Sequence, residues 1–192
     1  MSWRLRSEVC MGRLVVDTLQ GTTAAGNKIT ASSGHVLVIP GQPLQVLTAT
    51  SGPAAQTIAS TTPVAVTGLS VSITPKNANS TILIQATLNC NLPWVPSLGI
   101  FKDGAATVST SGYTNNNEAN MQVTIHDGAD VTDRIWTIDV NHVERAASTA
   151  ARTYQVYATS AWGGSTRNFI INNRSGSDMA GFSYMWVMEL AP

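Results

Sequence analysis

The chain has 192 residues, and its 11 basic and 11 acidic side chains cancel to zero net charge. Charged residues make up only 11% of the sequence, while hydrophobic residues make up 43%. A chain without a net basic field is a poor partner for nucleic acid or anionic lipid. The length fits one domain of ordinary size with an appendage, and the composition is typical of a β-rich appendage protein whose surface is uncharged but polar.

Residues 1–10 contain arginines but lack the apolar run of a signal peptide, and no stretch approaches the length of a membrane span. We therefore expect a protein that folds in a cytosol, without membrane insertion. The two cysteines, Cys10 and Cys90, lie far apart and form no metal-binding spacing. We expect both to be reduced, with Cys90 buried as an apolar side chain.

Residues 11 to about 50 carry short apolar clusters separated by turns rich in Gly, Ser and Pro. We interpret them as short strands without a core of their own, either disordered or ordered by contact with other chains. The prediction is an extended N-terminal arm over residues 1–50, for attachment and oligomerisation, followed by a β-domain over residues 51–192. Its predicted interface residues are Leu14, Val15, Val16, Leu19, Ile29, Val36, Leu37, Val38 and Ile39, and the same arm extends to Leu44 and Val46.

The rest of the chain shows repeated period-two alternation, which is typical of half-buried strands. It is clearest over residues 81–90 and recurs over residues 69–73, 136–140 and 154–158. In residues 183–190 both alternating sets are apolar, so we expect a strand that is central or pressed against a neighbouring subunit.

Turn signals separate these runs at the spacing of an all-β sandwich. Lys102-Asp103-Gly104-Ala105 predicts a tight hairpin, because Asp-Gly tolerates positive φ angles. Residues 143–154 are Ala-rich, but we expect a short connection there rather than a helix. The predicted fold is therefore all-β: an antiparallel, jelly-roll-like β-sandwich with an extended N-terminal β arm.

Residues 67–84, with the sequence TGLSVSITPKNANSTILI, resemble a module that recurs in virion proteins of tailed bacteriophages, especially predicted tail fibres. Further pieces similar to that module follow in the same order at residues 101–104, 153–156, 172–174 and 185–190, and residues 33–46 resemble segments that precede it. The resemblance implies a β-sandwich in a phage appendage, commonly trimeric.

This resemblance implies a non-enzymatic structural component of the virion, assembled in the cytoplasm of the host bacterium. The expected partners are further copies of the chain, in a homotrimer, and other virion proteins of capsid or tail. Since the chain is short for a tail fibre, a short fibre and a capsid decoration (cement) protein both remain open. The alternative is a receptor- or glycan-binding fibre tip, with Trp94, Tyr113 and Trp162 in ligand-facing loops; Trp136 and Trp186 are expected in the core.

The sequence contains little that indicates catalysis. The acidic residues 126–133 lack the spacing of an EF-hand, so we interpret them as structural turns rather than a calcium site. His126, His142 and Glu144 form no zincin-type motif, and neither a nucleophile elbow nor a phosphate-binding glycine loop is present. We therefore predict no catalytic residues, no metal and no cofactor.

Overall fold

The computed structural model describes residues 39–108, 121–125, 131–162, 165–176, 178 and 180–192. Every regular element within these ranges is a β-strand, and every paired strand is antiparallel. The predicted all-β class and β-sandwich are thereby confirmed. The predicted arm as far as Val38 lies outside the described residues, as do Tyr113 and His126.

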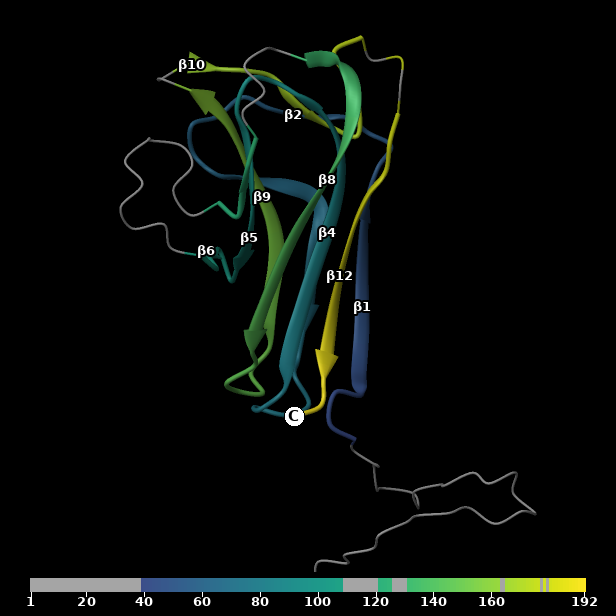
Figure 1. Ribbon diagram of the computed structural model, residues 1–192, viewed down its shortest axis with the longest axis vertical. Helices are drawn as coiled ribbons and strands as arrows, with labels where there is room; N and C mark the ends of the chain where they lie inside the picture. Colours follow the sequence, from purple (N-terminus) through teal and green to yellow (C-terminus); the bar gives the residue numbers. More distant parts are fainter. Residues whose placement is uncertain (1–38, 109–120, 126–130, 163–164, 177, 179) are drawn as a thin grey trace, which may run out of the picture. The chain divides into compact units, whose positions relative to one another are not determined.

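The first and last strands lie side by side in one sheet, which we call sheet A (Figure 1). Its broad part has the order β1–β12–β4–β8. The short strand β11 pairs with β4 at Cys90, past the last β12 partner at Thr87, and β2 pairs with β11. The bounds are β1 Pro43–Ser51, β2 Gln56–Ile58, β4 Thr81–Leu92, β8 Val131–Arg145, β11 Phe169–Ile171 and β12 Ser183–Leu190.

The second sheet, sheet B, has β9 at its centre, between β3 and β5. The short strands β6 and β7 pair with the other edge of β5, and β10 pairs with the end of β9. The bounds are β3 Val64–Ile73, β5 Pro96–Lys102, β6 Ala105–Ala106, β7 Val123–Thr124, β9 Arg152–Trp162 and β10 Ser165–Thr166.

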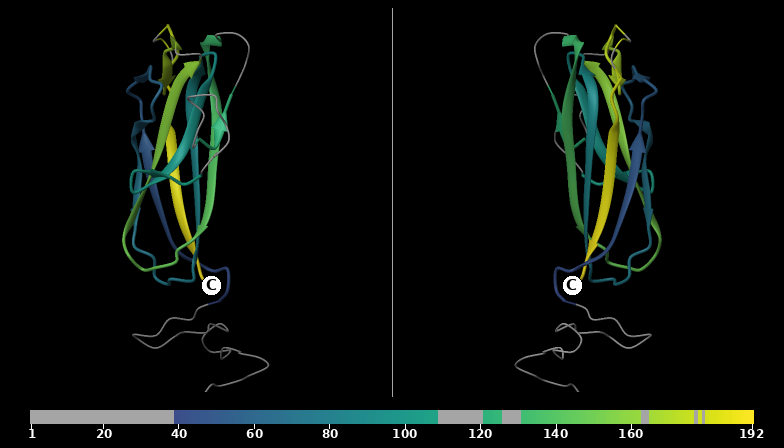
Figure 2. Two further views of the ribbon diagram at one scale, coloured as in Figure 1. Left: turned by 90° about the vertical axis from the view of Figure 1, so that its left-hand side faces the viewer. Right: turned by 90° about the vertical axis from the view of Figure 1, so that its right-hand side faces the viewer.

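Successive long strands alternate between the two sheets: β1, β4, β8 and β12 belong to sheet A, and β3, β5 and β9 to sheet B. This alternation, with the first and last strands adjacent, is the arrangement of a jelly roll. Figure 2 shows the sandwich from its two sides.

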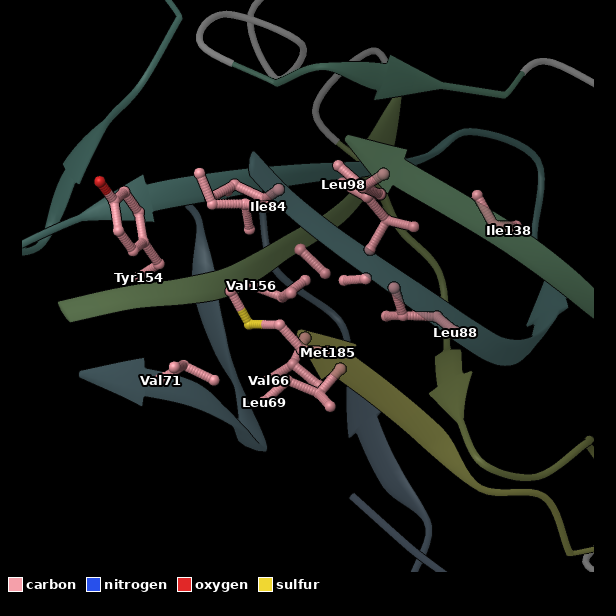
Figure 3. Close-up of a cluster of buried hydrophobic side chains, with 14 of the residues drawn as sticks. Val66, Leu69, Val71, Ile84, Leu88, Leu98, Ile138, Tyr154, Val156 and Met185 are labelled. Carbon is pink, nitrogen blue, oxygen red and sulfur yellow. The ribbon is translucent and has the colours of Figure 1, made fainter. Parts of the chain in front are cut away.

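The core lies between the sheets, and its side chains come from alternate positions of each strand (Figure 3). On β4 the inward residues are the apolar set of the sequence alternation, and none of them is more than 2% exposed. They meet inward side chains of sheet B, among them Leu98 and Val156. The inward set of β4 is Ile82, Ile84, Ala86, Leu88 and Cys90.

The hairpin and the connection expected from the sequence are both present. Asp103 and Gly104 join β5 to β6 with φ angles of 51° and 81°, as a two-residue turn of this type requires. β8 ends at Arg145 and β9 begins at Arg152, so the Ala-rich segment between them is a short connection.

The end of the predicted arm is part of the sandwich. β1 pairs with β12 from Pro43 to Ser51, and Leu47 and Ala49 pack against the core. Leu44 and Val46, which were predicted to belong to the arm, are therefore sheet residues, because β12 supplies the partner strand within the same chain. Sheet A therefore begins at Pro43, whereas the β-domain was predicted to begin at residue 51.

Candidate interaction surface

The outer face of sheet A carries a row of apolar side chains across all four broad strands. Val46 of β1 pairs with Met188 of β12, Met188 with Leu83 of β4, and Leu83 with Val143 of β8. Val46 is 50% exposed and Val143 is 60% exposed, while Leu83 and Met188 between them are half-buried. We call these four residues the apolar row.

The alternation within each strand places the apolar row on the outside. Ile82 and Ile84 flank Leu83 and point into the core, and Val187 does the same beside Met188. Because neighbours in a strand point to opposite faces, Leu83 and Met188 must point outward. A solvated sheet face normally alternates polar residues with the buried set, so this row is a departure from the expected pattern.

The outer face becomes polar with distance from the apolar row. In the next set of outward residues along the strands, Trp186 of β12 pairs with Gln85 of β4. Beyond it, Tyr184 is 48% exposed and pairs with Thr87, which pairs with Asp139. The apolar row is therefore bordered by Arg145 of β8 and Thr81 of β4 at the Pro43 end, and by polar residues with aromatic rings from β12 toward the end of β1.

The inner face holds a cluster of charged groups that joins the two sheets. Glu144 of β8 accepts hydrogen bonds from Lys102 of β5 at 2.7 Å and from the Tyr154 hydroxyl of β9 at 2.5 Å. The Arg152 guanidinium lies 3.5 Å from the same carboxylate, and His142 Nε2 lies 3.7 Å from it. A carboxylate from sheet A is thus held by three side chains of sheet B.

Burial raises the pKa of Glu144, but the hydrogen bonds from Lys102 and Tyr154 and the charges of Lys102 and His142 outweigh it and hold that pKa below its ordinary value. Burial, together with the hydrogen bond to Glu144, raises the pKa of Tyr154. Glu144 is consequently an anion at neutral pH, and Tyr154 is a neutral donor. This arrangement suits an electrostatic connection between the sheets.

The arrangement offers little for catalysis or metal binding. Glu144 is the one carboxylate of the cluster, and cationic or hydroxyl donors surround it. Among the described residues, no group of three or more His, Cys, Asp and Glu side chains gathers to hold a metal ion. His142 and Glu144, named together from the sequence, do lie together, while His126 is outside the described residues.

Several residues of the closing strand, the β5–β6 hairpin and the segment after β11 hold neighbouring parts of the fold together through hydrogen bonds. Glu189, in the closing strand, accepts hydrogen bonds from the backbone amides of Lys76 at 2.8 Å and Asn77 at 3.1 Å, and from the Gln45 side chain at 2.6 Å. Burial raises the pKa of Glu189, but the neighbouring Ser80 hydroxyl and these hydrogen bonds outweigh it and lower that pKa overall. The carboxylate therefore holds the β3–β4 turn against β12.

Hydrogen bonds also hold the β5–β6 hairpin and the segment after β11 in place. Asp103 accepts a hydrogen bond from the Thr153 amide at 2.8 Å, which holds the β5–β6 hairpin against β9. Asn172, with φ 64° and no exposed surface, receives a hydrogen bond from Ser183 and donates one to Ser51. Asn tolerates this left-handed conformation better than most residues, so its role in the fold explains the residue type.

Two of the three aromatic residues predicted to face a ligand, Trp94 and Trp162, are described, and both lie at the same end of the sandwich. Trp94, 36% exposed, lies between β4 and β5, and Trp162 ends β9. Pro96 pairs with Ser160, so both segments belong to the end of the sandwich remote from Pro43. Tyr113 lies outside the described residues. Of the predicted arm interface, Ile39 alone is described, and it is 53% exposed.

The two tryptophans predicted for the core are placed differently. Trp136 shares the inward phase of Ile138, yet it is 41% exposed, because β8 is an edge strand with a neighbour on one side. Trp186 is on the outer face, since Met185 and Val187 occupy the inward positions of β12. Both core assignments are wrong. Residues 183–190 were expected to form a strand that is central or pressed against a neighbouring subunit, and the structure shows the first of these, because β12 lies between β1 and β4.

The apolar row was not predicted from the sequence. A signal was present: Leu83 interrupts the polar set of β4, Val143 interrupts that of β8, and Met188 belongs to a strand that is apolar at both alternating positions. The pairing of these residues into one row depends on strand register, which the sequence does not reveal.

Cys90 is buried and unpaired, and burial raises its pKa to about 12. This thiol is therefore unreactive under ordinary conditions. The part of the chain that the structure describes contains no helix of the length and hydrophobicity that a membrane crossing requires.

A comparison with protein-family models finds no match to the chain, and a search of curated protein sequences finds none that is significantly similar.

Proposed function

We propose that this protein is a non-enzymatic structural component of a bacteriophage particle, a short fibre or a capsid decoration protein. In this proposal it forms a homotrimer, attaches to capsid or tail proteins through its N-terminal segment, and reaches the virion from the host cytoplasm. Copies of the chain associate through the outer face of sheet A. The apolar row on that face is the observation that carries the proposal.

The apolar row supports assembly because large exposed apolar groups on a sheet face are typical of protein interfaces. Val46 and Val143 at its two ends are at least half exposed.

A second candidate function is the recognition of surface glycans by the end of the sandwich that is remote from Pro43. Trp94 is exposed there, and the backbone of Trp162 lies at the same end. Aromatic rings stack on sugar faces, and loops at the free end of an attached module are well placed to meet a receptor. A glycan array tests this candidate: binding that Trp94→Ala abolishes would support it, and absence of binding would remove it.

The mass of the purified full chain in solution tests the assembly proposal. Light scattering should give a mass of about three times the 20.3 kDa of one chain at micromolar concentration. A stable monomer at high micromolar concentration would contradict self-assembly. A dimer would contradict the trimer while leaving self-assembly in place.

A further inference from the structure

We infer that the outer face of sheet A binds an extended, uncharged carbohydrate chain along β12, beyond the apolar row. The site consists of aromatic rings that follow one strand and of amide and hydroxyl groups on the neighbouring strands. It is separate from the Trp94 end of the sandwich, and it does not depend on self-assembly of the chain.

Two of the aromatic rings come from alternate residues of β12, which lies between β1 and β4 (Figure 1). Trp186 and Tyr184 are outward positions, because Met185 and Val187 beside them have no exposed surface and belong to the core. Two residues of a strand advance by about 7 Å, so one ring follows the other along β12. Tyr184 is 48% exposed and Trp186 is half-buried. The pair therefore offers ring surface to a ligand that runs along the strand.

A third ring continues this line just before β12. Phe182 is 55% exposed. A Cβ atom on Gly52 would lie only 2.7 Å from Phe182 Cδ1, so the ring lies against a glycine whose missing side chain gives it room. The Asn89 amide donates a hydrogen bond to the Phe182 carbonyl at 2.5 Å and holds the backbone at this point. Alternate positions 182, 184 and 186 thus carry rings that their own chain leaves partly uncovered.

Polar side chains flank the rings on both sides. Thr48 of β1 and Gln85 of β4 pair with Trp186, and Asn141 of β8 pairs with Gln85, so all of these side chains share one face. Thr48 and Asn141 are exposed, and Gln85 is half-buried. Hydroxyl and amide groups donate and accept hydrogen bonds, as the hydroxyl groups of a sugar do. Rings that stack on the apolar face of a sugar, beside groups that bond to its hydroxyls, suit carbohydrate recognition.

The face around the rings carries little charge. Among the described residues that pair with Tyr184 and Trp186, directly or through β4, Asp139 alone is charged, and it accepts a hydrogen bond from the Thr87 hydroxyl at 2.5 Å. Arg145 lies on the far side of the apolar row from the rings. The one charge beside the rings is therefore negative.

This charge pattern selects between ligands that stack on rings. Stacked rings on a sheet also bind single-stranded nucleic acid, but such binding requires cations along the phosphate backbone. At the start of β8, Arg174 is held in an ion pair with Asp178 at 2.5 Å, so its charge is already balanced. An uncharged carbohydrate is the ligand that fits the rings, the amides and the carboxylate together.

Affinity electrophoresis of the full chain tests this site. Native gels are cast with one soluble, uncharged polysaccharide each: hydroxyethyl cellulose, laminarin, galactomannan or dextran. We expect at least one of them to retard the wild type. Tyr184→Ala and Trp186→Ala should each weaken that binding about tenfold or more, because each removes a stacking surface. Tyr184→Phe keeps the ring and should retain the binding.

Trp136→Ala is the matched control, because Trp136 is 41% exposed but has the inward phase of β8; it should bind like the wild type. Val143→Lys should also bind, which separates this site from self-assembly. The inference is overturned if no polysaccharide retards the wild type, or if Trp136→Ala weakens binding as much as Tyr184→Ala. Binding by Val143→Lys alone would overturn it too, because another copy would then cover the rings. Retardation by single-stranded oligothymidylate instead, lost in Tyr184→Ala, would overturn the carbohydrate class.

Discussion

Sheets A and B both turn one face toward the core, but their outer faces differ in composition. On sheet B, Ser70 pairs with Gln155 and Ser72 with Thr153, and the last two hydroxyls lie 2.7 Å apart. Sheet A has Leu83, Met188 and their two neighbours in the equivalent outward positions. The β3–β9 part of sheet B has the composition of a face that meets water, and the apolar row of sheet A departs from that composition.

Apolar side chains do occur on the outside of sheet B, but they cover one another. The rings of Phe101 and Tyr157 stack with centroids 4.2 Å apart, and Phe101 is only 7% exposed. Val143 at the edge of sheet A is 60% exposed. An outward apolar residue on this sandwich therefore points to an interface only when its own chain leaves it uncovered, as for Val143. Phe101 gives no such indication, because the ring of Tyr157 already covers it.

The largest expected effect comes from placing a charge in the apolar row. Val143→Lys should weaken association at least about 100-fold, because an unpaired buried charge costs roughly 3–5 kcal/mol. Ser70→Lys, the matched change on the outer face of sheet B, should leave association unchanged. Sedimentation or light scattering over a concentration series measures both, and equal effects of the two variants would remove the distinction between the faces.

The next effect separates the two faces of a single strand. Ile84→Ala removes a side chain that is 2% exposed and should lower the free energy of unfolding by about 2–4 kcal/mol. Leu83→Ala should cost less than about 1 kcal/mol, because Leu83 is only half-buried by its own chain. Urea unfolding in the Val143→Lys background measures both without a contribution from association; a larger loss for Leu83→Ala would contradict the assigned faces.

A smaller effect is expected at the carboxylate that fastens the β3–β4 turn. Glu189→Gln keeps one acceptor oxygen but removes the charge that the Lys76 and Asn77 amides face. We expect a loss of about 1–3 kcal/mol in the free energy of unfolding, with no change in the association constant. A change in association instead would mean that this end of the sandwich, rather than the outer face alone, touches the partner.

The smallest effect is a dependence of stability on pH. Glu144 and Glu189 both have pKa values lowered by the folded structure from an ordinary 4.5. Their stabilisation is therefore complete above pH 4.5 and is lost as pH falls through the lower folded values. Urea unfolding between pH 7 and pH 3 should show this loss, and Glu144→Gln together with Glu189→Gln should reduce it; an unchanged slope would contradict the role of these carboxylates.

Local patterns predicted much of the fold. The alternation over residues 81–90 identified the inward set of β4, and Asp103-Gly104 identified a hairpin that the structure confirms. Trp136 was misassigned because the phase within a strand does not reveal that the strand lies at a sheet edge. Trp186 was misassigned because both alternating sets of residues 183–190 are apolar, so the sequence does not reveal which set points inward. The apolar row escaped prediction since its members are joined by register between segments up to 142 positions apart (Val46 to Met188).

The reactivity of two neighbouring methionines tests the central claim most directly. Met185 points into the core with no exposed surface, and Met188 lies in the apolar row. If a second copy covers the row, dilute peroxide should oxidise Met188 of the assembled wild type almost as slowly as Met185, and Val143→Lys should accelerate oxidation of Met188 alone. Rapid oxidation of Met188 in the wild type, at the rate found in Val143→Lys, would contradict a covered outer face.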